Sequence, residues 1–313
     1  IRLDQLLINP LANVSKAILK FWFTSDSKAN EGMPNDIKSL LNLIMNKPQS
    51  LVSGIAMLGT HLTALYWTDP GWTKEYLLPL SQWRNESVEL TTLMWRSILW
   101  NPSININESL LIEIRDDFLL TASHLANLGD EREIYVQLVC NFGVYNTDVL
   151  SYKELASTIK CFMPEDLHTM ARYLGMLIKN PEERLEDYWG ERINPFLKNC
   201  WPKSKELNTG DTAQEFALMC IYGKESFKTI YESVKYYLVG ITYPSYVIIE
   251  LEESELCGKY PKETLDLLYR TIGSNLGRVF DQSDLITCLK EIDMADSTLR
   301  SISEYSQLFD VIS

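Results

Sequence analysis

The side chains best suited to proton transfer near neutral pH are three histidines, His61, His124 and His168. No two of them are four residues apart and no His-Glu-x-x-His sequence occurs, so their spacing does not predict a zinc protease site. Asp117 precedes His124 by about two helical turns and could share its helix face, but no nucleophile accompanies the pair. His61 and His124 have apolar and small neighbours, so we expect them to be packing residues.

The cysteines and glycines form no recognisable site. A zinc cluster needs cysteines in close pairs, and none of the six stands in a Cys-x-x-Cys pair. We therefore expect buried free thiols in a reducing compartment. No glycine motif for a dinucleotide, a nucleotide phosphate or a hydrolase nucleophile occurs. The sequence predicts no catalytic residue, no metal and no cofactor. The cysteines are Cys140, Cys161, Cys200, Cys220, Cys257 and Cys288.

The formal net charge of -13 limits the partners of the chain. Nucleic acid and anionic membranes attract clustered basic residues, and the longest basic cluster, Lys198 to Lys205, is short and interrupted. We therefore expect no nucleic acid and no membrane. The longest apolar run, Leu51 to Trp67, is interrupted by Gly54, Gly59, His61 and Thr63 and is too short to span a bilayer. A protein partner or a small ligand remains.

The chain starts at Ile1 and has no signal peptide, which indicates a cytoplasmic segment of a longer protein. Hydrophobic residues make up 46% of it, enough to build a sizeable core. Acidic residues from Glu182 to Asp187 follow Pro181, where they suit the first turns of a helix. The run from Glu250 to Glu255 indicates a solvated helix face, with an acidic rim facing a partner as the alternative.

Aromatic residues are the most informative single feature. Eight tryptophans and sixteen tyrosines gather in a few clusters. Packing between helices accounts for most of them, and an exposed surface for a protein partner is the alternative. Trp189 and Arg192 lie one helical turn apart on the same face, where they could stack internally or face outward. The clusters are Tyr66, Trp67, Trp72 and Tyr76; Trp83, Trp95 and Trp100; Tyr188, Trp189, Phe196 and Trp201; and Tyr236, Tyr237, Tyr243 and Tyr246.

Apolar residues recur at three- and four-residue steps along almost the whole chain, a spacing typical of amphipathic helices. Proline or a capping residue marks many of the expected helix starts, as Pro34, Ser87 and Asn107 do. Residues 134–139 and 243–251 resemble strands, but they are short and have no partner hairpin, so we expect helix there.

Short linkers between these helices predict an all-α fold without a substantial sheet. We expect an irregular α-solenoid of antiparallel helix pairs, similar to HEAT or tetratricopeptide arrays. No exact repeat consensus occurs. The polar stretch 199–211 is the expected seam, so we divide the chain into a helical repeat block at 1–200 and a second helical block at 201–313, continuous with the first. Trp201 should anchor that seam.

Several short strings follow one another along the chain: Asp69 to Leu80, Leu99-Trp100, Asp117 to Leu119, His124, Leu128-Gly129, Tyr188-Trp189, Arg192, Pro195-Phe196, Trp201 to Ser204, Pro244, Tyr246-Val247, Leu256 to Gly258 and Pro261. In this order they resemble the C-terminal helical region of bacterial antiphage defence proteins that carry an N-terminal sirtuin-like domain. The resemblance covers about Leu51 to Leu268, most of the chain. It implies a sensor, oligomerisation arm or autoinhibitory scaffold beside an effector domain that degrades NAD. The sirtuin-type NAD-binding residues are absent here.

From this resemblance we expect a non-catalytic region that binds a phage protein or a neighbouring subunit and regulates or assembles the effector domain of the same parent chain. A homo-oligomer through the parent protein is compatible with it. The alternatives are a purely structural oligomerisation solenoid, and a hydrolase whose pocket holds His124 or His168 with carboxylates. The candidate partner-binding residues are Tyr188, Trp189, Arg192, Trp201, Lys203 and Tyr246.

Overall fold

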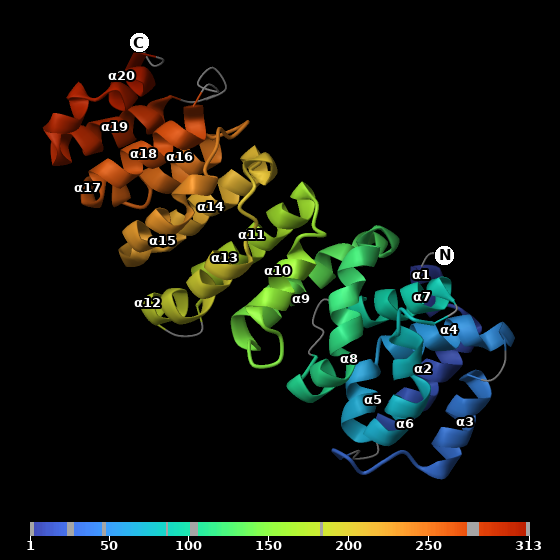
Figure 1. Ribbon diagram of the computed structural model, residues 1–313. Helices are drawn as coiled ribbons and strands as arrows, with labels where there is room; N and C mark the ends of the chain where they lie inside the picture. Colours follow the sequence, from blue (N-terminus) through green and yellow to red (C-terminus); the bar gives the residue numbers. More distant parts are fainter. Residues whose placement is uncertain are drawn as a thin grey trace. The chain divides into compact units, whose positions relative to one another are not determined.

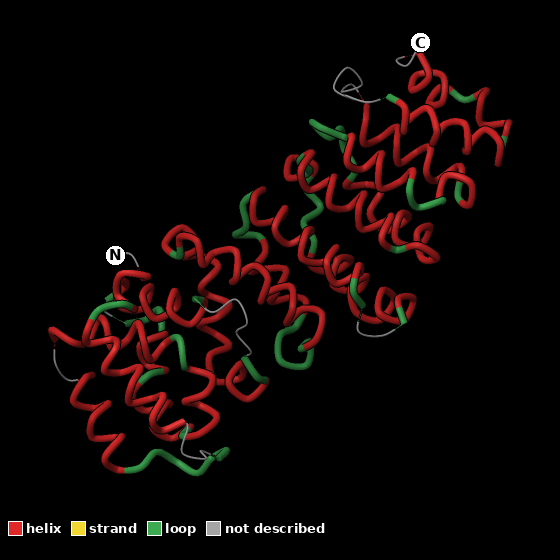
Figure 2. The backbone as a smooth tube through the Cα atoms, turned by 180° about the vertical axis from the view of Figure 1, so that it is seen from behind, coloured by secondary structure: helices red, strands yellow, loops and turns green. Residues whose placement is uncertain are grey.

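The computed structural model describes residues 3–23, 28–45, 48–85, 87–100, 106–181, 184–273 and 282–310 (Figure 1). Helices dominate these ranges, and no residue within them lies in a strand (Figure 2). The predicted all-α fold is therefore confirmed, and the solenoid arrangement stays a prediction. Of the strand-like stretches, 134–139 lies within α9 (Arg132–Tyr145), and 245–251 of the other lies in α16 (Ser245–Glu252). No helix in the described ranges has the length and apolar composition to cross a membrane.

The chain forms two compact units. The first comprises Ile1–Leu138 and Asp148–Glu154, and the second comprises Val139–Thr147 and Leu155–Ser313. α9 and α10 (Tyr152–Ile159) contribute residues to both units. The expected block boundary at residue 200 lies inside the second unit, so the compact units divide at other positions than the polar seam.

The first unit is built around α4, which packs against α1, α2, α3 and α7. Glycines in α4 allow this close packing: a Cβ on Gly54 would lie 2.5 Å from Ile44 of α3, and one on Gly59 would lie 2.5 Å from Ser97 of α7. The helices of this unit are α1 (Leu3–Leu7), α2 (Pro10–Phe23), α3 (Asn35–Met45), α4 (Pro48–Gly59), α5 (Leu62–Thr68), α6 (Pro70–Tyr76), η1 (Leu78–Ser81), α7 (Val88–Leu99), α8 (Glu108–Thr121), η2 (Ala122–Asn127) and η3 (Gly129–Glu131).

Asp69 organises the junction between α5 and α6. Its carboxylate caps α6 by accepting the Trp72 backbone N–H at 2.9 Å, and it accepts the Met33 backbone N–H and the Lys38 ammonium at 2.8 Å each. Pro70 suits the first helical position because no N–H is needed there. Burial alone would raise the pKa of Asp69, but the bonds from Lys38, Met33 and Trp72 outweigh it, and the pKa is lowered.

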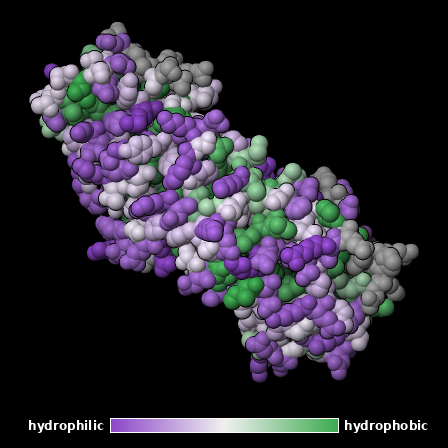
Figure 3. Space-filling model, viewed as in Figure 1, coloured by the Kyte–Doolittle hydropathy of each residue, from purple (hydrophilic) through white to green (hydrophobic). Residues whose placement is uncertain are grey.

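The second unit is built around two helices. α14 packs against α11, α15, α16 and α18, and α19 packs against α16, α17, α18 and α20. Hydrophilic side chains cover most of the face of this unit that Figure 3 shows. Its helices are α11 (Pro164–Lys179), α12 (Leu185–Tyr188), η4 (Trp189–Ile193), α13 (Asn194–Cys200), η5 (Lys205–Leu207), α14 (Gly210–Tyr222), η6 (Lys224–Ser226), α15 (Phe227–Val234), η7 (Lys235–Tyr237), α16, α17 (Leu256–Lys259), α18 (Pro261–Ile272), α19 (Ser283–Ala295), η9 (Ser297–Ser301) and α20 (Ser303–Asp310).

Most tryptophans fill the core, as the packing interpretation predicted. Six of the eight are buried, and Trp67 and Trp100 are 45% and 41% exposed. Trp201 packs edge-on against Phe216, with 4.8 Å between ring centroids, so the expected anchor of the polar seam is present. The buried tryptophans are Trp22, Trp72, Trp83, Trp95, Trp189 and Trp201.

Candidate functional site

Three of the six residues expected to bind a partner are core residues. Tyr188 and Trp189 are 1% exposed and Trp201 is 4% exposed, so none of them presents a side chain to a partner. The hydroxyl of Tyr188 is hydrogen-bonded to that of Tyr145. The interpretation of this aromatic cluster as a surface is therefore wrong for these three, because their rings fill the space between helices.

The segment between α12 and α13 is a π-helical turn, Trp189–Ile193, in which the Asn194 N–H donates to the Trp189 carbonyl. Pro195 accounts for the widened turn, because it has no N–H to donate and its ring would clash with the carbonyl of Glu191 in a regular α-helix. The buried indole nitrogen of Trp189 has no hydrogen-bond partner among the described residues.

The other three candidates lie in different places. The guanidinium of Arg192 lies over the ring of Tyr145, 5.5 Å from its centroid, so Arg192 stacks internally. Tyr246 is 47% exposed, and its hydroxyl is 3.5 Å from that of Tyr222. Lys203 is exposed and is the only one of the six that lines the groove described next.

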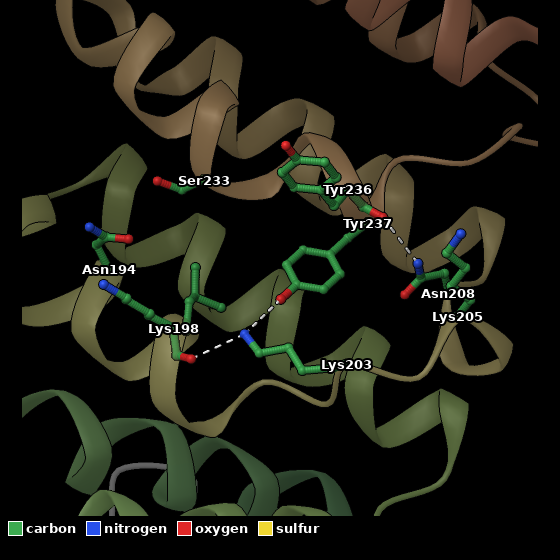
Figure 4. A pocket seen from close by; sticks show the side chains of 9 residues that line it. Asn194, Lys198, Lys203, Lys205, Asn208, Ser233, Tyr236 and Tyr237 are labelled. Atoms are coloured by element: carbon green, nitrogen blue, oxygen red, sulfur yellow. Dashed lines mark hydrogen bonds between the residues drawn. The ribbon is translucent and has the colours of Figure 1, made fainter.

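A groove of about 490 Å³ lies in the second unit, between the segment 194–208 and the segment 233–237. α13 and η5 provide one side, and the end of α15 with η7 provides the other. In the view of Figure 4, Lys198 and Lys205 lie on opposite sides of the Tyr237 ring. The lining residues are Asn194, Leu197, Lys198, Lys203, Lys205, Asn208, Ser233, Tyr236 and Tyr237. We refer to this site as the basic groove.

Core contacts hold the floor of the basic groove in place. The Lys203 ammonium donates to the Lys198 carbonyl at 3.1 Å and to the Tyr237 hydroxyl at 3.2 Å (Figure 4). The ring of Tyr237 stacks on Phe216, with 5.5 Å between centroids, and Phe216 packs on Trp201. Trp201 therefore contributes to the groove from beneath.

The charge of the basic groove contrasts with that of the whole chain. No carboxylate belongs to its described lining, and Lys198, Lys203 and Lys205 form no ion pair with any described residue. Neighbouring lysines are paired instead: Lys228 lies 2.7 Å from Glu263, and Lys235 lies 2.6 Å from Glu232. Three ammonium groups without an ion-pair partner among the described residues thus lie along one groove of a chain of net charge -13, an arrangement that favours an anionic partner there.

Tyr236 presents an aromatic surface at the edge of the basic groove. It is 73% exposed, and its backbone carbonyl accepts a hydrogen bond from the Asn208 amide at 3.3 Å, which joins the two sides of the groove. The Lys235 ammonium lies 5.5 Å from the centroid of its ring. Exposed tyrosines beside cations are typical of surfaces that bind proteins.

The histidines do not complete a catalytic arrangement with the residues predicted for one. His124 stacks on Trp83 at 3.8 Å, and Asp117 accepts the Trp83 backbone N–H instead of bonding to His124. Burial lowers the pKa of His124. The imidazole of His168 lies 3.4 Å from Glu215, whose hydrogen bond raises the pKa of His168. No described histidine lines the basic groove.

The cysteine nearest the groove in sequence is Cys200, at the end of α13. Burial raises the pKa of its thiol to about 12, although Lys203 acts in the opposite direction. The thiol is therefore protonated at neutral pH and is a packing group rather than a nucleophile. Cys140, Cys220, Cys257 and Cys288 are also buried, and Cys161 is exposed.

Comparison with known proteins adds no relative: no family model, no curated protein and no solved structure matches the chain. The chemistry of the site therefore rests on its own residues. Ammonium groups, phenol rings and side-chain amides can bind an anionic or aromatic partner, and the described lining holds no histidine, cysteine or carboxylate.

Most of the basic groove was not singled out from the sequence. Lys198 and Lys205 were noted only as a short basic cluster, and Tyr236 and Tyr237 only as an aromatic one. The basic cluster and the aromatic cluster can each be recognised in the sequence separately. Their proximity depends on the packing of α15 against α13 and of Phe216 against Trp201 and Tyr237, which local spacing does not show.

Proposed function

We propose that this chain is the non-catalytic, protein-binding helical region of a multidomain bacterial antiphage defence protein. In this proposal a phage protein or a neighbouring subunit docks on the second unit and regulates or assembles an effector domain of the same parent chain. The setting comes from the sequence resemblance described above. The basic groove is the observation that supports binding as the mode of action.

A binding role suits the groove because its parts are pre-positioned. Lys203 donates a hydrogen bond to Tyr237, and the ring of Tyr237 stacks on Phe216 in the core. A partner that docks there does not have to order these side chains, which lowers the entropic cost of association. The volume of about 490 Å³ is within the range of specific binding sites.

Regulation follows if the partner binds the two states of the effector with unequal affinity. A ligand shifts an equilibrium only by its difference in affinity for the two states. Docking at the basic groove would therefore favour the active effector state in infected cells, whereas a purely structural scaffold would show no such dependence on one surface.

The test is phage plaque formation, together with cellular NAD, in cells that express the parent protein. Three forms are compared: wild type, K198E/K205E, and the control K160E/K290E, which changes two exposed lysines outside the groove lining. The two variants lower the formal net charge by the same amount. Lys203 is left unchanged because it also holds the fold together.

We expect K198E/K205E to lose protection and to keep NAD high after infection, and K160E/K290E to behave as wild type. Equal protection by all three forms would contradict a role for the basic groove in defence. Protection by wild type without any fall in NAD would contradict the proposed effector.

A further inference from the structure

We infer that the basic groove binds an acidic peptide segment of a partner protein, in extended conformation, with an aromatic or aliphatic side chain between its carboxylates. This inference rests on the proposed function and names the chemistry of the partner. Three features of the groove support it: its aromatic floor, and lysines and an asparagine amide that have no ion-pair or hydrogen-bond partner, respectively, in a carboxylate or other side chain of the described residues.

The lysines specify the charge of the occupant. Lys198, Lys203 and Lys205 lack a carboxylate partner among the described residues, although the chain has 42 acidic residues. Carboxylates from outside would complete these pairs. Docking an acidic segment here also adds charge complementarity, which accelerates encounter and orients the partner.

The surrounding charge selects a short acidic segment over a nucleic acid. A nucleic acid carries phosphates continuously along its length, so it would extend from three lysines onto a chain of net charge -13. An acidic peptide places its charges only where the lysines are. No arginine belongs to the described lining, so the cations there are ammonium point charges without a fork for bidentate phosphate contacts.

The apolar floor of the basic groove indicates which side chain the partner peptide places between its carboxylates. Leu197 is buried beneath the groove, Tyr237 stacks on the core, and Tyr236 is 73% exposed at the edge. Together they offer an apolar and aromatic surface flanked by cations. An aromatic or aliphatic residue of the partner would cover Tyr236 and gain from the removal of apolar surface from water.

The polar lining suits an extended backbone. The amide of Asn194 forms no hydrogen bond with the described part of the chain, and an amide offers both a donor and an acceptor, as a peptide bond requires. The Ser233 hydroxyl donates to the Thr229 carbonyl at 3.0 Å and keeps its acceptor capacity. Asn194 and Ser233 lie on opposite sides of the groove, on α13 and α15.

The experiment is fluorescence anisotropy with the full chain and two labelled peptide pools. One pool is rich in Asp and Glu around a central aromatic residue, and the matched pool replaces Asp and Glu by Asn and Gln. Wild type, K198E/K205E, K198Q/K205Q and the control K160E/K290E are compared at low and high salt. Circular dichroism and thermal unfolding verify that each variant is folded.

We expect wild type to prefer the acidic pool and to lose affinity at high salt. K198E/K205E should bind at least about tenfold more weakly, K198Q/K205Q should fall in between, and K160E/K290E should stay within about twofold of wild type. The neutral variant keeps the test decisive if charge reversal prevents folding.

Four results would overturn the inference. The first is equal affinity for both peptide pools, and the second is an equal loss of affinity in the groove variants and the control variant. The third is binding of single-stranded RNA or pyrophosphate in place of the acidic pool. The fourth is self-association of the chain that K198E/K205E abolishes. The last result would make the acidic surface of a second copy the occupant. If peptides fail to bind but K198E/K205E still abolishes phage protection, this inference falls and the proposed function stands.

Discussion

Lys203 and Tyr237 are distant in sequence, yet the ammonium of Lys203 donates a hydrogen bond to the phenolic oxygen of Tyr237 over 3.2 Å. The same ammonium holds the carbonyl of Lys198 at 3.1 Å, and the ring of Tyr237 stacks on Phe216. A surface lysine is thereby tied to the core. The end of α13 and η7 are fixed relative to each other, and the basic groove lies between them.

Replacing Tyr237 separates its two roles. Tyr237→Phe removes only the phenolic oxygen, so the free energy of unfolding should change by less than about 1 kcal/mol. Lys203 keeps its bond to the Lys198 carbonyl but loses the one to Tyr237, so binding of acidic peptides should weaken. Tyr237→Ala also removes the ring from Phe216 and should cost about 2 kcal/mol or more. Urea denaturation measures both variants, and equal losses would show that the ring contributes nothing.

Asp69→Asn should destabilise the first unit at neutral pH. Asparagine can still cap α6 at Trp72, but it cannot pair with Lys38 as a carboxylate does, so we expect a loss of about 1.5–3 kcal/mol. The pKa of Asp69 is lowered in the folded chain, so its contribution is present above the unfolded value of 3.8 and is lost as the pH falls through the folded pKa.

Urea denaturation at neutral and at acidic pH checks this sign. The difference between wild type and Asp69→Asn should shrink as the pH drops below about 4. A difference that stays constant over this range would mean that the ion pair with Lys38 is not the source of the stabilisation.

The two histidines should respond to pH in opposite directions. The hydrogen bond to Glu215 raises the pKa of His168, so its contribution is present below the unfolded pKa of 6.5 and is lost as the pH rises through the folded value. Burial lowers the pKa of His124, so folding favours its neutral form and stability is lost as the pH falls below 6.5.

His168→Gln should therefore cost more stability at pH about 5.5 than at pH about 8.5, and His124→Gln should show the reverse order. The differences should stay under about 1 kcal/mol because both rings are partly exposed. Titration by NMR gives each pKa directly, and shifts of the same sign for both histidines would refute this assignment.

Gly143→Ala should disturb the helix that carries Lys198. A Cβ at this position would lie 2.3 Å from the ring of Phe196 in α13, so overpacking should cost about 1–3 kcal/mol. Gly175 in α11 is the matched control, because a Cβ there meets no atom within 4 Å. Gly175→Ala should stabilise the chain by about 0.5–1 kcal/mol. Thermal unfolding distinguishes these opposite signs, and a stabilising Gly143→Ala would show that Phe196 moves aside freely.

Trp189→Phe should be tolerated because the indole N–H is buried without a partner among the described residues. Removing that donor relieves a desolvation cost of about 1–3 kcal/mol, which offsets the loss of ring volume. Trp189→Ala lacks this compensation and should cost about 3–5 kcal/mol. Chemical denaturation compares the two variants, and a large loss for Trp189→Phe would indicate a bound water on the indole nitrogen.

Local sequence patterns predicted the helices but not the site. Residues 243–251 are predicted as helix because no partner strand is available, and α16 occupies 245–251 of them. The spacing of Trp189 and Arg192 did not reveal their orientation, because burial depends on the helices that pack against them. Trp189 and Trp201 proved to be core residues, and the exposed aromatic side chain at the groove is that of Tyr236.

The central claim is that the basic groove contacts a protein, and photocrosslinking from within it tests this most directly. A photoreactive residue replaces Tyr236 in the parent protein in infected cells, and exposed Tyr243 is the control position. We expect a crosslink from position 236 to an acidic segment of one protein, lost in K198E/K205E and kept in K160E/K290E. A crosslink that survives K198E/K205E, or crosslinks from position 243 alone, would contradict the claim.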